Sequence, residues 1–219
     1  MRKQKNHSRI YKIDGVGVNL ERFYPCTSSD EKIALREKYG FSSDDFILIY
    51  TAEFIPRKNH KLLFDILPAL KAKIPPLKVL LCGKGELLEQ YKDFASEKQM
   101  NYVTFTGYTK DVADYCRLSE LLVMPSFQEG LPMAMIEAIA TGLPVVASDI
   151  RGHNDVIEDC ANGFLFGTDD VTGFEKAILT LYKNPALRTE MGERNIERAA
   201  SFSVEKAVGA MDAIYHTVM

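Results

Sequence analysis

Six short apolar runs, separated by longer stretches, organise the chain from residue 46 onward. The runs are continuous and contain many β-branched residues, which is typical of strands buried on both faces. Most precede a stretch with apolar residues at helical spacing, and this alternation predicts βαβ units and a parallel sheet. We therefore predict an α/β protein with a Rossmann-like, doubly wound parallel sheet of about six strands. The expected strands are 46–51, 78–82, 102–107, 120–126, 144–148 and 163–167.

The predicted domain spans residues 25–200, and shorter segments flank it on both sides. Residues 1–24 are expected to be a lead-in segment or interdomain linker. Residues 201–219 start with an N-cap signal at Ser203 and carry apolar residues at helical spacing, which predicts a C-terminal helix that needs a surface to pack against.

Charge and cysteine content exclude several classes of protein. A net charge of −3 gives no reason to expect a nucleic-acid partner, because such proteins carry a clear basic excess. The four cysteines are scattered without a CxxC pair, so reduced thiols are expected, and the histidines show no metal-ligand spacing.

A cytoplasmic location is expected, because no run reaches the 18 apolar residues of a membrane span and the first residues lack an apolar signal core. Five basic residues lie among the first 13 positions. We interpret them as a solvated chain end; a peripheral contact with anionic lipid at the inner face of the membrane is the alternative.

Parallel sheets of this class bind ligands at the carboxyl ends of their strands, which directs attention to three loops. The loops follow the first, fourth and fifth expected strands and read AEFIPRKN, FQEGLP and DIRGHND. By contrast, GKGE at 83–86 lacks the known phosphate-loop patterns and is interpreted as a tight turn. His153, in the third loop, is interpreted as a polar loop residue.

The stretch SFQEGLPMAMIEA at 126–138 enters a predicted helix near Pro132, whose missing N–H costs nothing in a first turn. Gly130 allows a ligand to approach the backbone closely. N–H groups between residues 131 and 134 are expected to point outward with the positive end of the helix dipole and to form an anion site.

Two glutamates, Glu129 and Glu137, flank this helix start with seven residues between them. Glu129 is placed to accept hydrogen bonds from hydroxyl groups beside a bound phosphate. Glu137 lies about 7.5 Å along the helix from Pro132, roughly the reach from a diphosphate to a ribose. The alternative is a carboxylate that serves the helix dipole together with a surface glutamate.

Arg57 and Lys58 follow the first strand and could neutralise a diphosphate, which arginine binds with two hydrogen bonds. The competing interpretation is a solvated pair at a helix start. That position is slightly unfavourable for positive charge, but by themselves the two residues leave both interpretations open.

In combination these motifs resemble the retaining family-4 glycosyltransferases of the GT-B fold. PSFQEGLPMAMIEAIATGLPVVAS resembles their E-x7-E region, EFIPRKNHKLL is similar to their donor-phosphate loop, and VTFTGY and NGFLF look like their base-side loop and late strand. The resemblance covers about residues 13–200. It implies the C-terminal, nucleotide-sugar-binding half of a GT-B enzyme.

The resemblance implies a role for each matching residue. Arg57 and Lys58 would bind the donor diphosphate, Glu129 the sugar hydroxyls and Glu137 the ribose. The remaining donor-binding positions would be Gly107 and Tyr108 beside the base, and Gly130, Leu131 and Met133 at the sugar and phosphate. No metal or other cofactor is expected, in keeping with the absence of an Asp-x-Asp motif.

The implied function is transfer of a sugar from a nucleotide-sugar, a UDP-sugar by default, to a glycan or lipid-linked glycan acceptor. The segment RGHNDVIEDCANG looks most like that of members that build capsule, lipopolysaccharide or exopolysaccharide. Alternatives are a non-catalytic nucleotide-sugar-binding module and a GT-B-type sugar-nucleotide epimerase.

The sequence departs from the family pattern at two points. The usual Asn-Gly-Val-Asp lead-in is replaced by Val16-Gly17-Val18-Asn19. The N-terminal acceptor domain has no counterpart in the first 25 residues, so the 219-residue chain alone is expected to bind donor and to catalyse little. In the family the last helix crosses to that domain, so residues 203–219 of this chain are expected to be left partly unsupported or to pack elsewhere.

Overall fold

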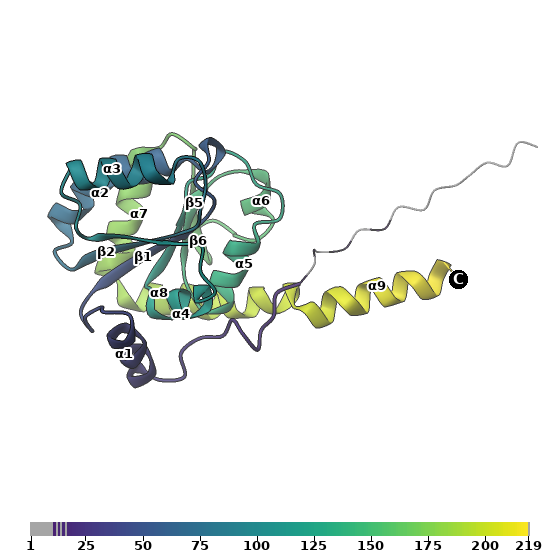
Figure 1. Ribbon diagram of the computed structural model, residues 1–219. Helices are drawn as coiled ribbons and strands as arrows, with labels where there is room; N and C mark the ends of the chain where they lie inside the picture. Colours follow the sequence, from purple (N-terminus) through teal and green to yellow (C-terminus); the bar gives the residue numbers. More distant parts are fainter. Residues whose placement is uncertain (1–10, 12, 14, 16, 219) are drawn as a thin grey trace, which may run out of the picture.

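Six parallel strands form the sheet of the protein, in the order β3-β2-β1-β4-β5-β6 (Figure 1). The structure is a computed structural model that describes residues 11, 13, 15 and 17–218. Every strand overlaps a predicted one, so the Rossmann-like α/β class is confirmed. The strands are β1 (Phe46–Thr51), β2 (Leu77–Cys82), β3 (Val103–Gly107), β4 (Leu121–Met124), β5 (Val145–Ser148) and β6 (Gly163–Phe166).

The order of the strands reverses at β1. The chain first moves outward from β1 through β2 to β3, and it then returns to place β4 on the other side of β1. Phe46 of β1 lies opposite Leu77 of β2, while Leu48 lies opposite Leu121 of β4. Open parallel sheets bind ligands beyond the carboxyl ends of the strands at such a reversal. The loops that carry Arg57 and Glu129 begin at this point.

Helices cover both faces of the sheet (Figure 1). One face carries α2 (His60–Lys73), α3 (Leu88–Glu97) and α7 (Val171–Lys183), and the other carries α4 (Val112–Leu118), α5 (Met133–Ala140) and α8 (Pro185–Ala199). Helix α2 packs against α7, and α5 packs against α4 and α8. The remaining helices are α1 (Ser29–Lys38), the short η1 (Pro56–Lys58), α6 (Arg151–Asn154) and η2 (Ala200–Phe202), and α9 (Val204–Val218).

The continuous apolar runs are buried as their pattern predicts. Ile47, Leu80, Val123 and Val146 have no exposed surface and belong to one core cluster that also contains Phe174 of α7. Burying one side chain of this size stabilises the fold by about 1.5–3 kcal/mol. The strands are therefore fixed from both sides, and their carboxyl ends form a rigid base for the loops above them.

Side chains outside the helices fix several helix starts. Ser28 accepts a hydrogen bond from the amide of Glu31, Asp170 from that of Gly173, and Asn184 from that of Leu187. These bonds satisfy amides that have no partner within the helix.

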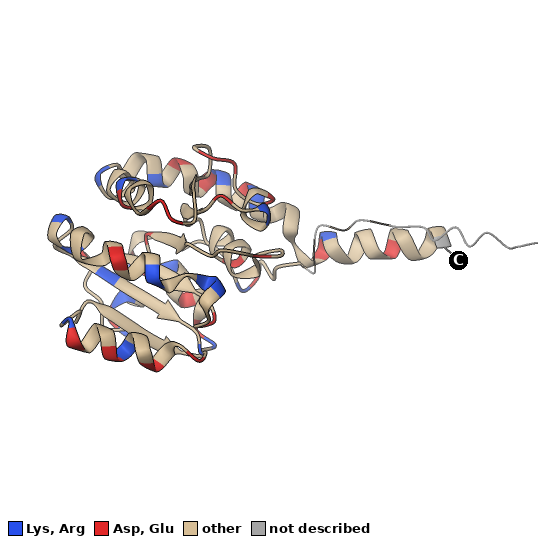
Figure 2. Cartoon of the chain, turned by 90° about the horizontal axis from the view of Figure 1, so that it is seen from above, with Lys and Arg blue, Asp and Glu red and all other residues tan. Residues whose placement is uncertain are grey.

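The last helix, α9, extends away from the sheet (Figures 1 and 2). Ser203 precedes it and accepts a hydrogen bond from the amide of Lys206 at 3.3 Å. Val18 is hydrogen-bonded to the backbone on both sides of Ser203, so the lead-in segment meets the start of α9. Val208 and Tyr215 are 61% and 59% exposed. That α9 crosses to another domain stays a prediction.

None of the described helices is both long enough and apolar enough to cross a membrane.

Candidate functional site

The loops after β1 and β4 lie side by side at the carboxyl edge of the sheet. Asn59 adopts a left-handed conformation, with φ of 50°, directly after η1. Its side-chain amide donates hydrogen bonds of 3.0 Å to the carbonyl groups of Pro125 and Thr168. The Phe127 amide donates to the carbonyl of Arg57 at 2.8 Å. These bonds tie the two loops together before any ligand is considered.

Lys58 and Glu129 form an ion pair across this junction. The Nζ atom of Lys58 lies 2.5 Å from Oε1 of Glu129, and the two side chains are only 12% and 7% exposed. Ser126 Oγ donates to the same carboxylate oxygen at 2.8 Å. The sequence prediction gave each residue a ligand of its own, and the structure shows that they are also partners of one another.

Tyr50 of β1 forms hydrogen bonds with residues of both loops that carry this pair. Its hydroxyl donates to the carbonyl of Lys58 at 2.7 Å and lies 3.0 Å from the hydroxyl of Ser126. Complete burial raises the pKa of the Tyr50 phenol well above its ordinary value. The phenol therefore stays neutral, and its hydrogen bonds position Lys58 and Ser126 relative to β1.

Arg57 differs from its neighbour in that its side chain is exposed. Within the described part of the chain, the guanidinium has no ion pair or hydrogen bond. One cation of the loop is thus held by a carboxylate, while the other is available to an anion. This asymmetry could not be read from the adjacent sequence letters.

The start of α5 differs in detail from the prediction. Pro132 is the residue before the helix, and the helix itself begins at Met133. The amide of Met133 donates to the carbonyl of Leu131 at 3.0 Å, so the expectation of free N–H groups throughout 131–134 is wrong at this residue. Among the described residues, the amides of Gly130, Leu131 and Ala134 have no hydrogen-bond acceptor, and these can meet a ligand.

Glu137 lies further along α5 and is partly buried. Burial raises the pKa of its carboxyl group above the ordinary value of 4.5, while the Arg22 guanidinium acts to lower it. Arg22 also donates to the carbonyl of Lys110 at 2.7 Å, which connects this region to the loop after β3. Sequence reasoning missed Arg22, because it lies in the lead-in segment without a motif or spacing to mark it.

Gly107 ends β3 at the same edge of the sheet, and Tyr108 follows it. Gly107 has φ of +67°, and there is open space beside its Cα. Tyr108 is 76% exposed, with the Nζ of Lys84 at 5.7 Å from its ring centre. The two predicted base-side residues therefore present a flat aromatic surface to solvent.

Gly15, in the lead-in segment, lies beside Leu131 of the predicted site. A Cβ atom added to Gly15 would lie 2.2 Å from Cδ2 of Leu131, and Gly15 has φ of +114°. On the other side of the loop, a Cβ atom on Gly152 would lie 2.0 Å from the carbonyl oxygen of Gly130. The backbone contact at Gly152 therefore requires glycine, whereas the contact of Gly15 is with the flexible end of the Leu131 side chain.

His153 is not the polar loop residue that the sequence suggested, because it is fully buried in α6. Its Nδ1 lies 2.8 Å from the carbonyl oxygen of Ser148, which can only accept, so this nitrogen carries the proton. The Nε2 atom is buried without a partner among the described residues. Burial lowers the pKa of the imidazole, and the ring is therefore neutral.

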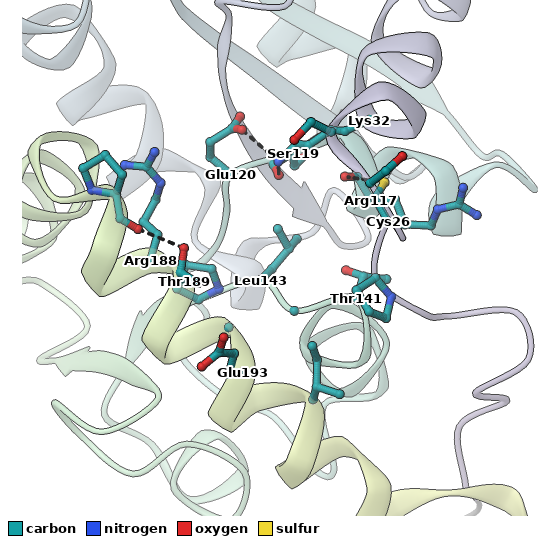
Figure 3. Close-up of a pocket in the computed structure, with 18 residues that line it drawn as sticks. Cys26, Lys32, Arg117, Ser119, Glu120, Thr141, Leu143, Arg188, Thr189 and Glu193 are labelled. Atoms are coloured by element: carbon teal, nitrogen blue, oxygen red, sulfur yellow. Dashed lines mark hydrogen bonds and ion pairs between the residues drawn. The ribbon is translucent and has the colours of Figure 1, made fainter.

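A pocket of about 560 Å³ lies at the opposite, amino end of the strands (Figure 3). Its lining includes Ser119 and Glu120, which precede β4, and Pro144, which precedes β5. Two of its charged side chains, Lys32 and Glu120, form an ion pair at 2.9 Å. None of the predicted site residues lines this pocket, and we place the functional site at the carboxyl edge.

Within the described residues there is no group of three or more histidine, cysteine, aspartate or glutamate side chains that could hold a metal ion. The expectation that the site uses no metal or other cofactor stays a prediction.

Comparison with known proteins assigns the family. The profile of the family described as "Glycosyl transferases group 1" matches residues 31–198. The chain belongs to this family. The GT-B relationship inferred from the motif order is thereby confirmed, while the individual site assignments stay predictions.

One relative of this chain matches it over nearly all of its residues. The chain is 38% identical over 217 residues to a protein of Bacillus subtilis (strain 168) with the name "Putative glycosyltransferase EpsD", and it spans 57% of that protein. It is thus little more than half as long as this relative.

Solved structures with the same fold include two that are 27% identical to this chain. A sucrose-phosphate synthase from Thermosynechococcus elongatus matches with a TM-score of 0.80, over 92% of this chain and 51% of that one. A variant of S. aureus TarM, in complex with fondaparinux, α-GlcNAc-glycerol and UDP, matches with a TM-score of 0.72, over 78% and 36%.

Proposed function

We propose that this chain is the donor-binding half of a glycosyltransferase that moves a sugar from a UDP-sugar to a glycan acceptor with retention at the anomeric carbon. The observation that carries the proposal is the arrangement around the Lys58–Glu129 pair. Arg57, which has no ion pair within the described part of the chain, precedes Lys58 in the same loop, and α5 begins four residues after Glu129. Glu137 follows on the same helix.

Each residue is assigned the part of the donor that its chemistry suits. Arg57 and Lys58 bind the diphosphate, and Glu129 accepts hydrogen bonds from sugar hydroxyls through Oε2, which has no hydrogen bond within the described part of the chain. Glu137 accepts those of the ribose. Gly107 and Tyr108 lie beside the base.

Backbone contacts complete the proposed donor site. The amides of Gly130 and Leu131 can reach sugar or phosphate without rearrangement. Met133 can do so only if its amide exchanges the carbonyl of Leu131 for the ligand.

Catalysis in this proposal is electrostatic. Negative charge grows on the diphosphate as it leaves, and cations and amides fixed around it stabilise the transition state more than the ground state. The structure offers a reason for this preorganisation, because Asn59, Ser126 and Tyr50 hold the two loops together in advance. We propose no metal or other cofactor, since the nucleotide-sugar is itself the donor substrate.

The wider setting is part of the same proposal. We infer that a second Rossmann-like domain faces this edge of the sheet in the complete enzyme and binds the acceptor, a glycan or lipid-linked glycan. We assign the enzyme to family 4, to the cytoplasm or the inner face of the membrane, and to the synthesis of capsule, lipopolysaccharide or exopolysaccharide. The choice of UDP is supported by its presence in the related TarM structure.

Calorimetric titration of the chain with UDP tests the proposal directly. We expect saturable binding of UDP and much weaker binding of uridine, because the diphosphate provides the charge that Arg57 and Lys58 recognise. Equal affinity for UDP and uridine, or no binding of any nucleoside diphosphate, would overturn the assignment.

A further inference from the structure

Lys84 lies in a loop that is clamped between two parts of the proposed site. The loop follows β2, and its glycines Gly83 and Gly85 have φ of +155° and +150°. A Cβ atom on Gly83 would lie 1.9 Å from the carbonyl oxygen of Ala52, and one on Gly85 would lie 2.5 Å from that of Phe54. Only glycine permits this close backbone approach.

Hydrogen bonds fix the loop on both sides. The amide of Phe54 donates to the carbonyl of Lys84 at 2.8 Å, and the amide of Gly83 donates to the carbonyl of Gly107 at 2.9 Å. The backbone of Lys84 is therefore attached both to the loop that leads to Arg57 and to the strand end that carries Tyr108.

The side chains of Lys84 and Tyr108 form a small recognition surface. The ammonium group lies 5.7 Å from the centre of the exposed ring of Tyr108. Within the described part of the chain, the Lys84 side chain makes no ion pair or hydrogen bond. A cation and an aromatic face, both accessible and both on anchored backbone, are thus free for a ligand.

The proposed placement of the donor directs its base toward this surface. Arg22 connects the neighbourhood of Glu137 to the carbonyl of Lys110, two residues after Tyr108. With the diphosphate at Arg57 and the ribose at Glu137, the base extends toward Tyr108 and Lys84. This step rests on the proposed function.

Tyr108 and Lys84 can recognise a base in different ways. An aromatic face stacks on any base and does not distinguish one from another. An ammonium group has three hydrogen-bond donors and no acceptor, so it suits a ring carbonyl such as O4 of uracil and not the amino group of cytosine in the same position. We propose that Lys84 selects nucleotide donors whose base carries a carbonyl oxygen at this edge, while Tyr108 supplies a platform that does not select.

UDP and CDP provide a matched pair for the test, because they differ only in the group at position 4 of the base and in the proton that uracil carries on the adjacent N3. We would measure the affinity of both by calorimetry for the wild-type chain, Lys84→Met and Tyr108→Ala. The wild type is expected to prefer UDP by about tenfold. Lys84→Met, which keeps most of the unbranched side chain and removes the charge, should reduce this preference to less than about threefold, mainly through weaker binding of UDP. Tyr108→Ala should weaken both ligands and leave their ratio unchanged.

Several results would overturn the inference while the proposed function survives. Equal losses of UDP and CDP affinity in Lys84→Met would mean that Lys84 acts on the phosphates. A wild-type chain that binds CDP as tightly as UDP would remove the selectivity altogether. By contrast, a folded wild-type chain that binds no nucleoside diphosphate would contradict the proposed function itself, and the inference with it.

Discussion

The Nζ atom of Lys58 lies 2.5 Å from Oε1 of Glu129, and this ion pair joins the loop after β1 to the loop after β4. The two loops stand on either side of the point where the strand order reverses. Because neither side chain is freely exposed, each charge depends on the other. The pair is therefore both a structural link and the centre of the proposed donor site.

Replacement of Lys58 by methionine should destabilise the protein. The change leaves the Glu129 carboxylate mostly buried without its cation, and we expect a loss of about 2–4 kcal/mol in the free energy of unfolding. The double variant Lys58→Met/Glu129→Gln should lose less than the sum of the single variants. Urea denaturation of the four proteins measures the coupling; strictly additive losses would show that the pair contributes nothing.

Glu129 and Glu137 should respond differently to the two forms of the ligand. Glu137→Gln should weaken UDP and UDP-sugar alike by about tenfold, because both contain the ribose. Glu129→Gln should weaken only the UDP-sugar, since the sugar is the part of the ligand assigned to Glu129. Calorimetry with both ligands provides the comparison. Equal losses of the two affinities in Glu129→Gln would contradict the role assigned to that residue.

His60 should make the protein less stable in mild acid. Burial lowers the pKa of this imidazole to about 4 in the folded protein, whereas the ordinary value is 6.5. Between these values the unfolded chain binds a proton that the folded chain does not, so the free energy of unfolding falls as the pH drops from about 6.5 to 4. The expected loss is about 2–3 kcal/mol.

His60→Phe provides the matched variant, because the imidazole stacks on Phe54 with ring centres 4.2 Å apart. A phenyl ring keeps this packing but does not titrate. Denaturation at several pH values should therefore show a shallower acid dependence for the variant. An unchanged slope would mean that His60 does not titrate as described.

Gly83→Ala should disturb the edge of the sheet far more than Gly107→Ala. Both glycines have positive φ, but only Gly83 faces the backbone of a neighbouring loop at Ala52. We expect a loss of about 3 kcal/mol or more for Gly83→Ala, and about 1 kcal/mol for the strain alone at Gly107. Thermal unfolding measures both; similar losses would mean that the close approach at Ala52 is not constraining.

Much of the fold could be predicted from the sequence, because the spacing of apolar residues along each segment indicates whether it forms a strand or a helix. Continuous apolar runs such as 46–51 and 144–148 identify strands buried on both faces, and helical spacing identifies α2 and α3. The start of α5 was displaced by one residue, since the backbone at Pro132 turns before it becomes helical.

The contacts of the site were less predictable than its residues. That Lys58 pairs with Glu129 depends on the spacing of β1 and β4 in the sheet, which no local pattern encodes. Arg22 approaches Glu137 from the lead-in segment, and His153 is buried by the close contact of α6 with Gly130. Each is a tertiary contact between segments distant in sequence. An arginine in the lead-in segment or a histidine in a loop does not by itself indicate such a contact.

The affinity of the chain for UDP, measured by calorimetry with Arg57→Ala and Arg194→Ala beside the wild type, tests the central claim most directly. Arg194→Ala is the control, because it removes the same charge from α8, where the side chain pairs with Glu190. We predict that Arg57→Ala weakens UDP binding by at least about tenfold and that Arg194→Ala leaves it unchanged. An unchanged affinity in Arg57→Ala, in a chain that still binds UDP, would contradict the placement of the diphosphate at this edge.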